Sequence, residues 1–148
     1  MSSGFHHDVA TARQQLEAAR AAVLDAITGF TDDALDRARR GGWSVRRVLQ
    51  HVNDSEWHYA RLVTQLRGLP VPTPPAGQDM PPSMPEAVRR LSASHQALLA
   101  ALEGIDEESF YRLGPGDREE YSVLSVLENA AHHDREHAQQ MGSITATQ

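Results

Sequence analysis

Apolar side chains recur at alternating spacings of three and four residues in four segments of the chain, and this spacing places them on one face of an α-helix. The segments cover residues 8–27, 45–66, 83–105 and 122–141. The inner side of the third segment carries Val88, Leu91, Leu98, Leu102 and Ile105. The pattern therefore predicts four amphipathic helices.

Residues that favour helix starts stand before three of these segments. Ser83 is followed three positions later by Glu86, which is the spacing of a capping box. The second and fourth helices share an aromatic–serine start, Trp43–Ser44 and Tyr121–Ser122. In the second helix the serine is the predicted N-cap, and the indole is placed to pack on Val48 as a hydrophobic staple.

The shared start is part of an internal repeat. Residues 29–35 resemble residues 104–110, and residues 43–49 resemble residues 121–127. Each half is a helix, an acidic turn and a second helix, and such a half buries its own apolar face poorly. We therefore predict an all-α fold, a single four-helix bundle domain over residues 1–148, with chance similarity of amphipathic helices as the alternative to a true repeat.

The two halves are joined by a proline-rich segment, residues 70–85. Proline disfavours regular helix, and such a segment extends readily. A long crossover between the second and third helices, running along the whole bundle, is therefore the expected connection.

Composition narrows the function classes. The chain has 148 residues, which fits one domain, and contains no cysteine, so a transition-metal site has only His, Asp or Glu as ligands. The net charge of -6 disfavours nucleic-acid binding. No apolar run approaches the ~20 residues of a membrane span, and the N-terminus lacks a signal-peptide pattern, so we expect a cytoplasmic protein.

Two histidines occupy positions where the last helix would otherwise be apolar. His133 and His137 lie one turn apart on the face that Val126 and Ala130 assign to the core, an arrangement that lets two imidazoles reach one metal ion. Hydrogen bonding within the bundle or at its rim is the alternative explanation. In the second helix a similar polar break at residues 55–56 lies next to His51, a candidate third ligand.

Taken together, three sequence stretches resemble the DinB-like metalloenzyme family: residues 42–45, residues 48–51 ending in His51, and residues 133–137 with His133 and His137 at their ends. The resemblance implies a four-helix bundle with a long crossover, often a homodimer, and a three-histidine site for zinc, nickel or another divalent ion. Family members are similar to thiol-dependent S-transferases and isomerases, or to hydrolases. A small-molecule substrate, including a low-molecular-weight thiol, is thereby implied.

Three imidazoles leave a divalent ion at least one open position, where the ion can acidify water or hold a thiolate. The candidates for a general base or a supporting contact are Asp54, Glu56 and Asp134, which lie on or beside the polar breaks. A zinc-protease motif is excluded because Asp134 replaces its glutamate. A di-iron carboxylate site is excluded because the required Glu-x-x-His pairs are missing.

The remaining candidates carry less weight. His95 falls on the inner stripe of the third helix and is a candidate fourth ligand, although a hydrogen-bonded core or rim histidine is more common. His58 is placed to flank the mouth of the site. His6 and His7 are expected in a frayed terminus, Trp43 and Tyr121 as core anchors, and Arg39, Arg40, Arg46 and Arg47 as a solvated face.

Two functions of different classes stay open. In the first, the chain is a metal-dependent thiol S-transferase or hydrolase that acts on a small molecule. In the second, the ion only pins the second and fourth helices together, and the bundle serves as a dimerising or ligand-binding module.

Overall fold

The computed structural model describes residues 3–76, 79–114 and 120–146 and is helical throughout its regular elements. Four long helices form the bundle: α1 (Ser3–Ala26), α2 (Val45–Arg67), α3 (Met84–Ala101) and α5 (Val123–Ala146). Two short helices, η1 (Asp32–Asp36) and α4 (Glu107–Tyr111), lie in the acidic turns between them. The predicted all-α bundle is confirmed.

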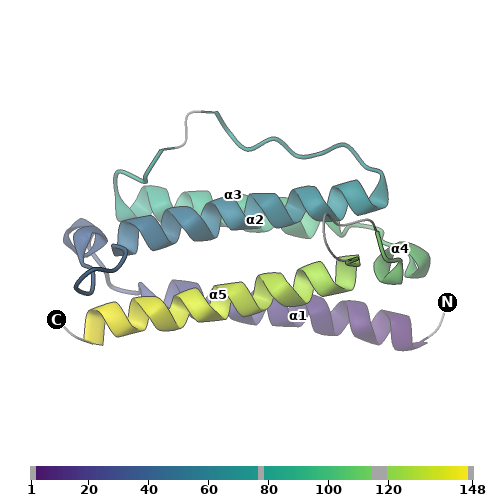
Figure 1. Ribbon diagram of the computed structural model, residues 1–148, viewed down its shortest axis with the longest axis horizontal. Helices are drawn as coiled ribbons and strands as arrows, with labels where there is room; N and C mark the ends of the chain where they lie inside the picture. Colours follow the sequence, from purple (N-terminus) through teal and green to yellow (C-terminus); the bar gives the residue numbers. More distant parts are fainter. Residues whose placement is uncertain (1–2, 77–78, 115–119, 147–148) are drawn as a thin grey trace.

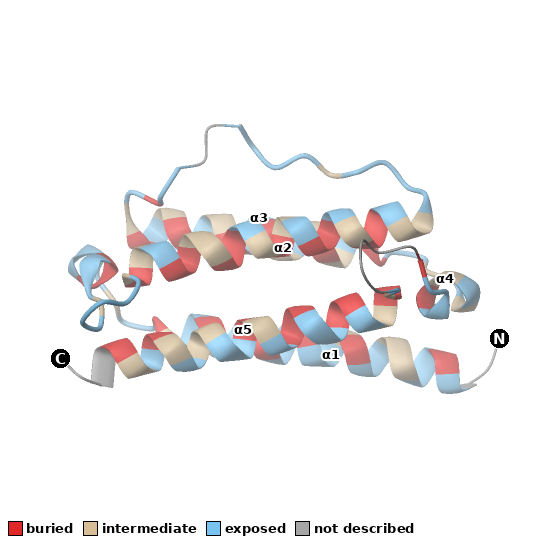
Figure 2. Cartoon of the chain, in the orientation of Figure 1, coloured by how far each residue is buried: buried red, intermediate tan, exposed pale blue. Residues whose placement is uncertain are grey.

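The long helices pair by direction. Helices α1 and α5 run parallel to each other, α2 and α3 run parallel in the opposite direction, and the two pairs face one another (Figure 1). Helix α2 packs against both α3 and α5, whereas α1 packs mainly against α5. Because parallel neighbours cannot be joined by a short turn, the chain after Gly68 returns along the bundle before α3 begins, as predicted for the crossover. Most of this crossover is exposed (Figure 2).

The predicted caps are present at α2 and α3. Ser44 Oγ accepts a hydrogen bond from the Arg47 backbone N–H at 3.2 Å, and Ser83 Oγ accepts one from the Glu86 backbone N–H at 3.2 Å. The Glu86 carboxylate accepts from Arg90 Nε at 2.8 Å and not from the N-cap, so the expected capping box is only half formed. Helix α2 ends at Gly68, whose φ of 67° is a left-handed conformation that glycine adopts without strain.

The internal repeat is visible in three dimensions. Gly29 and Gly104 both have positive φ, 81° and 67°, at the ends of their helical segments. After the short helix of each half, an isolated antiparallel bridge leads the chain into the next long helix, Ala38 to Ser44 in one half and Gly114 to Tyr121 in the other. The two halves therefore share local design as well as sequence.

Each acidic turn supplies one completely buried apolar side chain. Leu35 of η1 packs in a cluster with Val48, Leu49 and other side chains of α1, α2, α3 and α5. Phe110 of α4 packs in a second cluster, where its ring lies 5.8 Å from that of Phe5 in an edge-on arrangement. Leu35 and Phe110, which occupy equivalent positions of the repeat, thus close the two ends of the bundle, and we call them the two plugs.

Four boundaries or faces differ from the sequence prediction. Helix α3 ends at Ala101, so Ile105 packs from the following turn, and α5 continues beyond Met141 to Ala146. Val88, expected inside, is 39% exposed because α1 and α3 pack little against each other and leave its face uncovered. His6 and His7 are not in a frayed end: they lie in the first turns of α1, which Phe5 anchors in the core.

Truncating the two plugs tests their role. We expect Leu35→Ala to lower the free energy of unfolding by about 2–5 kcal/mol and Phe110→Ala by about 3–5 kcal/mol, because each leaves a cavity in a closed cluster. Urea denaturation measures both losses. Leu113→Ala, at a side chain that is 60% exposed, is the control and is expected to change stability by less than about 0.5 kcal/mol. Losses below about 1 kcal/mol in both plug variants would contradict the assignment.

Candidate metal centre

Three imidazoles meet at the seam between α2 and α5. The Nε2 atom of His133 lies 3.0 Å from Nε2 of His51 and 3.0 Å from Nε2 of His137. The three residues form a group whose ligand atoms lie within 4.8 Å of one another. The sequence prediction that these three histidines come together is therefore confirmed, and the group can hold a metal ion.

The number of hydrogens that the ring nitrogens can share favours a cation between the three rings over a purely hydrogen-bonded cluster. Nδ1 of His137 lies 2.7 Å from Gln140 Oε1, an acceptor, so Nδ1 carries the hydrogen and Nε2 presents a lone pair to the cluster. His133 Nε2 can donate at most one hydrogen, although it touches two nitrogens, and its buried Nδ1 has no hydrogen-bond partner. A cation accepts all three lone pairs at once, and nitrogens bound tetrahedrally to zinc stand about 3.4 Å apart.

The environment keeps two of the imidazoles in the neutral form that a metal requires. Burial, followed by the neighbouring His137 and His51, lowers the pKa of His133 to about 4. Burial, followed by the neighbouring His137, also lowers the pKa of His51, while Asp54 opposes this shift and Arg47 adds to it. Both rings therefore present lone pairs at neutral pH.

A buried ionic network lies beside the histidines and joins all four long helices. Arg20 of α1 donates to Glu56 Oε2 on α2 at 2.7 Å, to Asp134 Oδ2 on α5 at 3.1 Å and to the Leu91 carbonyl oxygen on α3 at 2.7 Å. His95 Nδ1 on α3 lies 2.8 Å from Glu56 Oε1. The three charged residues are at most 4% exposed, and burial still raises the pKa of Asp134 despite the opposing effect of Arg20.

The network follows the internal repeat. Its central residue, Arg20, was not predicted from the sequence. The register that pairs Trp43 with Tyr121 also pairs Glu56 with Asp134, and the register that pairs Gly29 with Gly104 pairs Arg20 with His95. A signal was available, because Arg20 follows Leu16 by one turn and precedes Val23 on the inner stripe of α1. A charge in that position indicates a buried ionic partner.

The three candidate bases have different surroundings. Glu56 and Asp134 are buried and bonded to Arg20, whereas Asp54 is exposed on α2, where its Oδ1 accepts from Gln50 Nε2 at 2.9 Å. Their catalytic roles stay predictions. His95, the candidate fourth ligand, does not join the three-histidine group and instead contacts Glu56. His58 lies two turns beyond His51, largely exposed, and its Nδ1 is 3.0 Å from the Arg61 guanidinium. The partial burial of its ring, followed by the charge of Arg61, lowers its pKa.

Trp43 is not the core anchor that the sequence indicated. It is 36% exposed, and its ring meets that of His51 edge-on at a centroid distance of 5.2 Å. Tyr121, its counterpart in the repeat, is partly buried and packs against the apolar cluster around Phe110. The indole therefore belongs to the surroundings of the three-histidine group.

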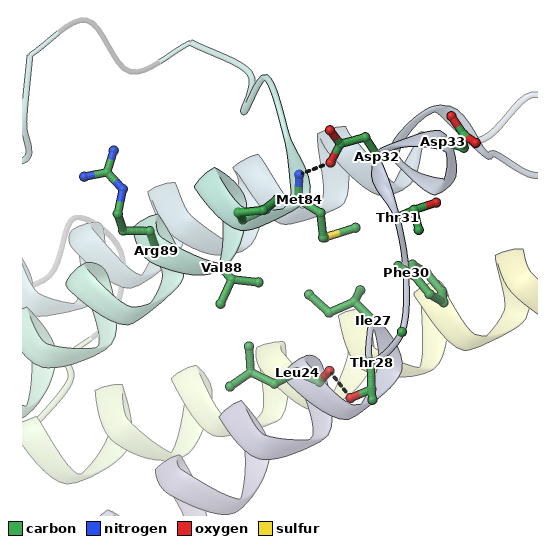
Figure 3. Close-up of a pocket in the computed structure, with 12 residues that line it drawn as sticks. Leu24, Ile27, Thr28, Phe30, Thr31, Asp32, Asp33, Met84, Val88 and Arg89 are labelled. Atoms are coloured by element: carbon green, nitrogen blue, oxygen red, sulfur yellow. Dashed lines mark hydrogen bonds between the residues drawn. The ribbon is translucent and has the colours of Figure 1, made fainter.

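A wide, shallow pocket lies elsewhere, at the end of the bundle where α1 meets η1 and the start of α3. Leu24, Ile27, Met84 and Val88 line it, and Asp32 accepts a hydrogen bond from the Met84 backbone N–H across its upper edge (Figure 3). None of the three histidines lines this pocket. It exists because the faces of α1 and α3 are left unpaired, and it is separate from the candidate metal centre.

Comparison with known families agrees with the fold and with the histidine group. The family model of the DinB superfamily matches residues 15–141, which include all of α2 and α3, the second half of α1, most of α5 and all three histidines. This chain belongs to the DinB superfamily. No curated protein and no solved structure gives a significant match. Within the described part of this DinB-superfamily chain, no helix combines the length and the apolar character needed to cross a membrane.

Removing single ligands tests the centre directly. We expect the protein, purified without a metal-affinity column, to carry one divalent ion per chain by elemental analysis, and His51→Ala, His133→Ala and His137→Ala to lose it. His132→Ala is the matched control, because His132 is exposed on the same helix and pairs only with Glu136. A substoichiometric ion in the wild type, or retention in His51→Ala, would show that the three rings do not form one site.

A second test concerns the buried network. We expect Arg20→Met to lower the free energy of unfolding by about 3–5 kcal/mol, because two buried carboxylates lose their counter-charge. Adding Glu56→Gln and Asp134→Asn removes those charges and should recover a large part of the loss. Urea denaturation measures each variant, with Arg135→Met on the surface as the control. If the triple variant is no more stable than Arg20→Met, uncompensated charge is not the cause.

Proposed function

We propose that this chain is a metal-dependent enzyme of the thiol S-transferase or hydrolase type, acting on a small molecule at His51, His133 and His137. The observation that carries the proposal is a three-nitrogen group that is only partly buried and that no fourth protein ligand completes within the described residues. Structural zinc sites are usually closed by four protein ligands, whereas catalytic sites keep a position free. The zinc or nickel ion implied by the family fits this donor set.

The residues in and around the three-histidine group have different roles in this proposal. His51, His133 and His137 would hold the divalent ion, which would supply a Lewis acid with an open position for water or a thiol. Gln140 fixes the ring of His137 through the hydrogen bond to Nδ1. Among the candidate bases, we assign proton transfer to Asp54, because its carboxylate is exposed and it lies about one helical turn after His51 on α2. Glu56 and Asp134 instead hold α2 and α5 in place through Arg20.

The alternative is a non-catalytic bundle in which the ion pins α2 to α5. It is favoured by the placement of the histidines on two helices that are far apart in sequence. The two functions differ in one measurable property, because a pinning site is closed and a catalytic site must admit an outside ligand.

Cobalt substitution distinguishes them. We expect the visible absorption of the Co(II)-loaded protein to change when 2-mercaptoethanol is added, since a thiol can occupy the open position. Asp54→Asn should keep the cobalt but require a higher pH for the same change, because the side chain no longer accepts the thiol proton. An absorption spectrum that thiol leaves unchanged would favour the pinning function.

A further inference from the structure

An arginine lies over the exposed indole next to the metal centre. The guanidinium carbon of Arg47 is 4.6 Å from the centroid of the Trp43 ring, whose edge meets the ring of His51. Arg47 also lies one helical turn before His51 on α2, so both side chains project from the same face.

Helix stability does not explain this arginine. With Ser44 as the N-cap, Arg47 lies in the first turn of α2, where the positive end of the helix dipole disfavours a cation. The backbone N–H of Arg47 completes the cap, but the side chain gives nothing back to Ser44. The position therefore costs the helix some stability, which suggests another use for the charge.

The internal repeat provides a comparison within the same chain. The register that pairs Trp43 with Tyr121 pairs Arg47 with Ser125 and His51 with Asn129. Ser125 completes a reciprocal cap, since its Oγ accepts from the Ser122 backbone N–H at 2.9 Å while its own N–H donates to Ser122 Oγ at 3.1 Å. The helix start whose equivalent of His51 is Asn129 thus has the residue that stabilises the start, whereas the helix start that leads to His51 has a cation.

Two of the neighbouring arginines, Arg46 and Arg39, are engaged elsewhere. Arg46 donates to Asp36 and to the Pro81 carbonyl oxygen, which ties it to η1 and the crossover. Arg39 donates to Ser143 Oγ at 2.7 Å on α5. Across the described ranges of the chain, no carboxylate lies within ion-pair distance of the Arg47 guanidinium, so its donors remain available.

We propose that Arg47, held over Trp43, binds an anionic group, a carboxylate or phosphate, on the small molecule that occupies the metal centre. The planar guanidinium matches the geometry of such groups, and the chain as a whole, with a net charge of -6, offers anions little general attraction. This inference rests on the proposed function, because it assigns the substrate class of the same site. Arg47 is a specificity-determining residue, and Trp43 positions it.

Two thiols that differ in charge test the assignment on Co(II)-loaded protein. 2-Mercaptoethanol is neutral, whereas 3-mercaptopropionate carries a carboxylate, and the cobalt absorption reports the Kd of each. We expect Arg47→Ser to weaken 3-mercaptopropionate binding about tenfold, the worth of one charge-assisted hydrogen bond, and to leave 2-mercaptoethanol binding within about twofold. Arg47→Lys should retain part of the discrimination. Because Ser125 is the natural counterpart, Arg47→Ser should have a Tm equal to or above that of the wild type.

Arg61→Ser is the matched control, since it removes one exposed positive charge from the same helix about 15 Å beyond His51 by helical rise. It should leave both thiol affinities unchanged. Equal weakening of both thiols in Arg47→Ser, or of 3-mercaptopropionate in Arg61→Ser, would overturn the inference while leaving the open metal centre intact. A wild type that takes up no cobalt, or whose cobalt spectrum responds to neither thiol, would overturn the proposed function and this inference together.

Discussion

The buried charge of Arg20 is the constraint on which the rest of this bundle depends. An arginine removed from water is tolerated only if its charge is compensated and its donors meet acceptors. Arg20 meets carboxylates of α2 and α5 and a backbone carbonyl oxygen of α3. Satisfying them fixes how far α2 and α5 slide past each other, because Glu56 and Asp134 must reach the same guanidinium. Since Asp134 follows His133 directly, the same constraint sets the height at which the histidines of α5 meet His51. The apolar clusters supply most of the driving force, but they are less selective for register.

The network and the metal centre are neighbours with opposite exposure. The ionic groups are almost completely buried and fully bonded to one another, which suits a fixed support. The imidazoles are partly exposed, the pKa values of His51 and His133 are lowered, and His137 is oriented by Gln140, which suits a ligand set that receives an ion and a further molecule. Placing the rigid charges one layer beneath the ligands keeps the ligand geometry independent of what binds at the surface.

The internal repeat explains how such a support arises. Repeat-equivalent positions hold Glu56 and Asp134, and also Arg20 and His95, so the network has approximate twofold symmetry inside the bundle. The candidate functional residues lie at positions where the two halves differ. His51 and Arg47 stand where the other half has Asn129 and Ser125, and the metal centre accordingly forms on only one side of the pair α2 and α5. Residues at equivalent positions of the two halves thus form the buried support, and residues that differ between the halves provide the candidate functional groups.

The sequence by itself determined the four long helices, the serine caps of α2 and α3, the crossover and the pairing of His133 with His137, because periodicity, capping and spacing are local properties of the chain. His51 was singled out by the internal repeat and the family resemblance and not by local spacing. The sequence misplaced Val88 and Trp43, since the exposure of a helix face or a loop residue depends on which neighbours cover it. It also overlooked Arg20, whose role depends on partners 36, 71 and 114 positions away in the chain. Only the tertiary structure decided that Glu56 and Asp134 share the guanidinium of Arg20 while Asp54 stays exposed. The reason is that contacts between side chains of different helices depend on the register of those helices, which no local sequence pattern encodes.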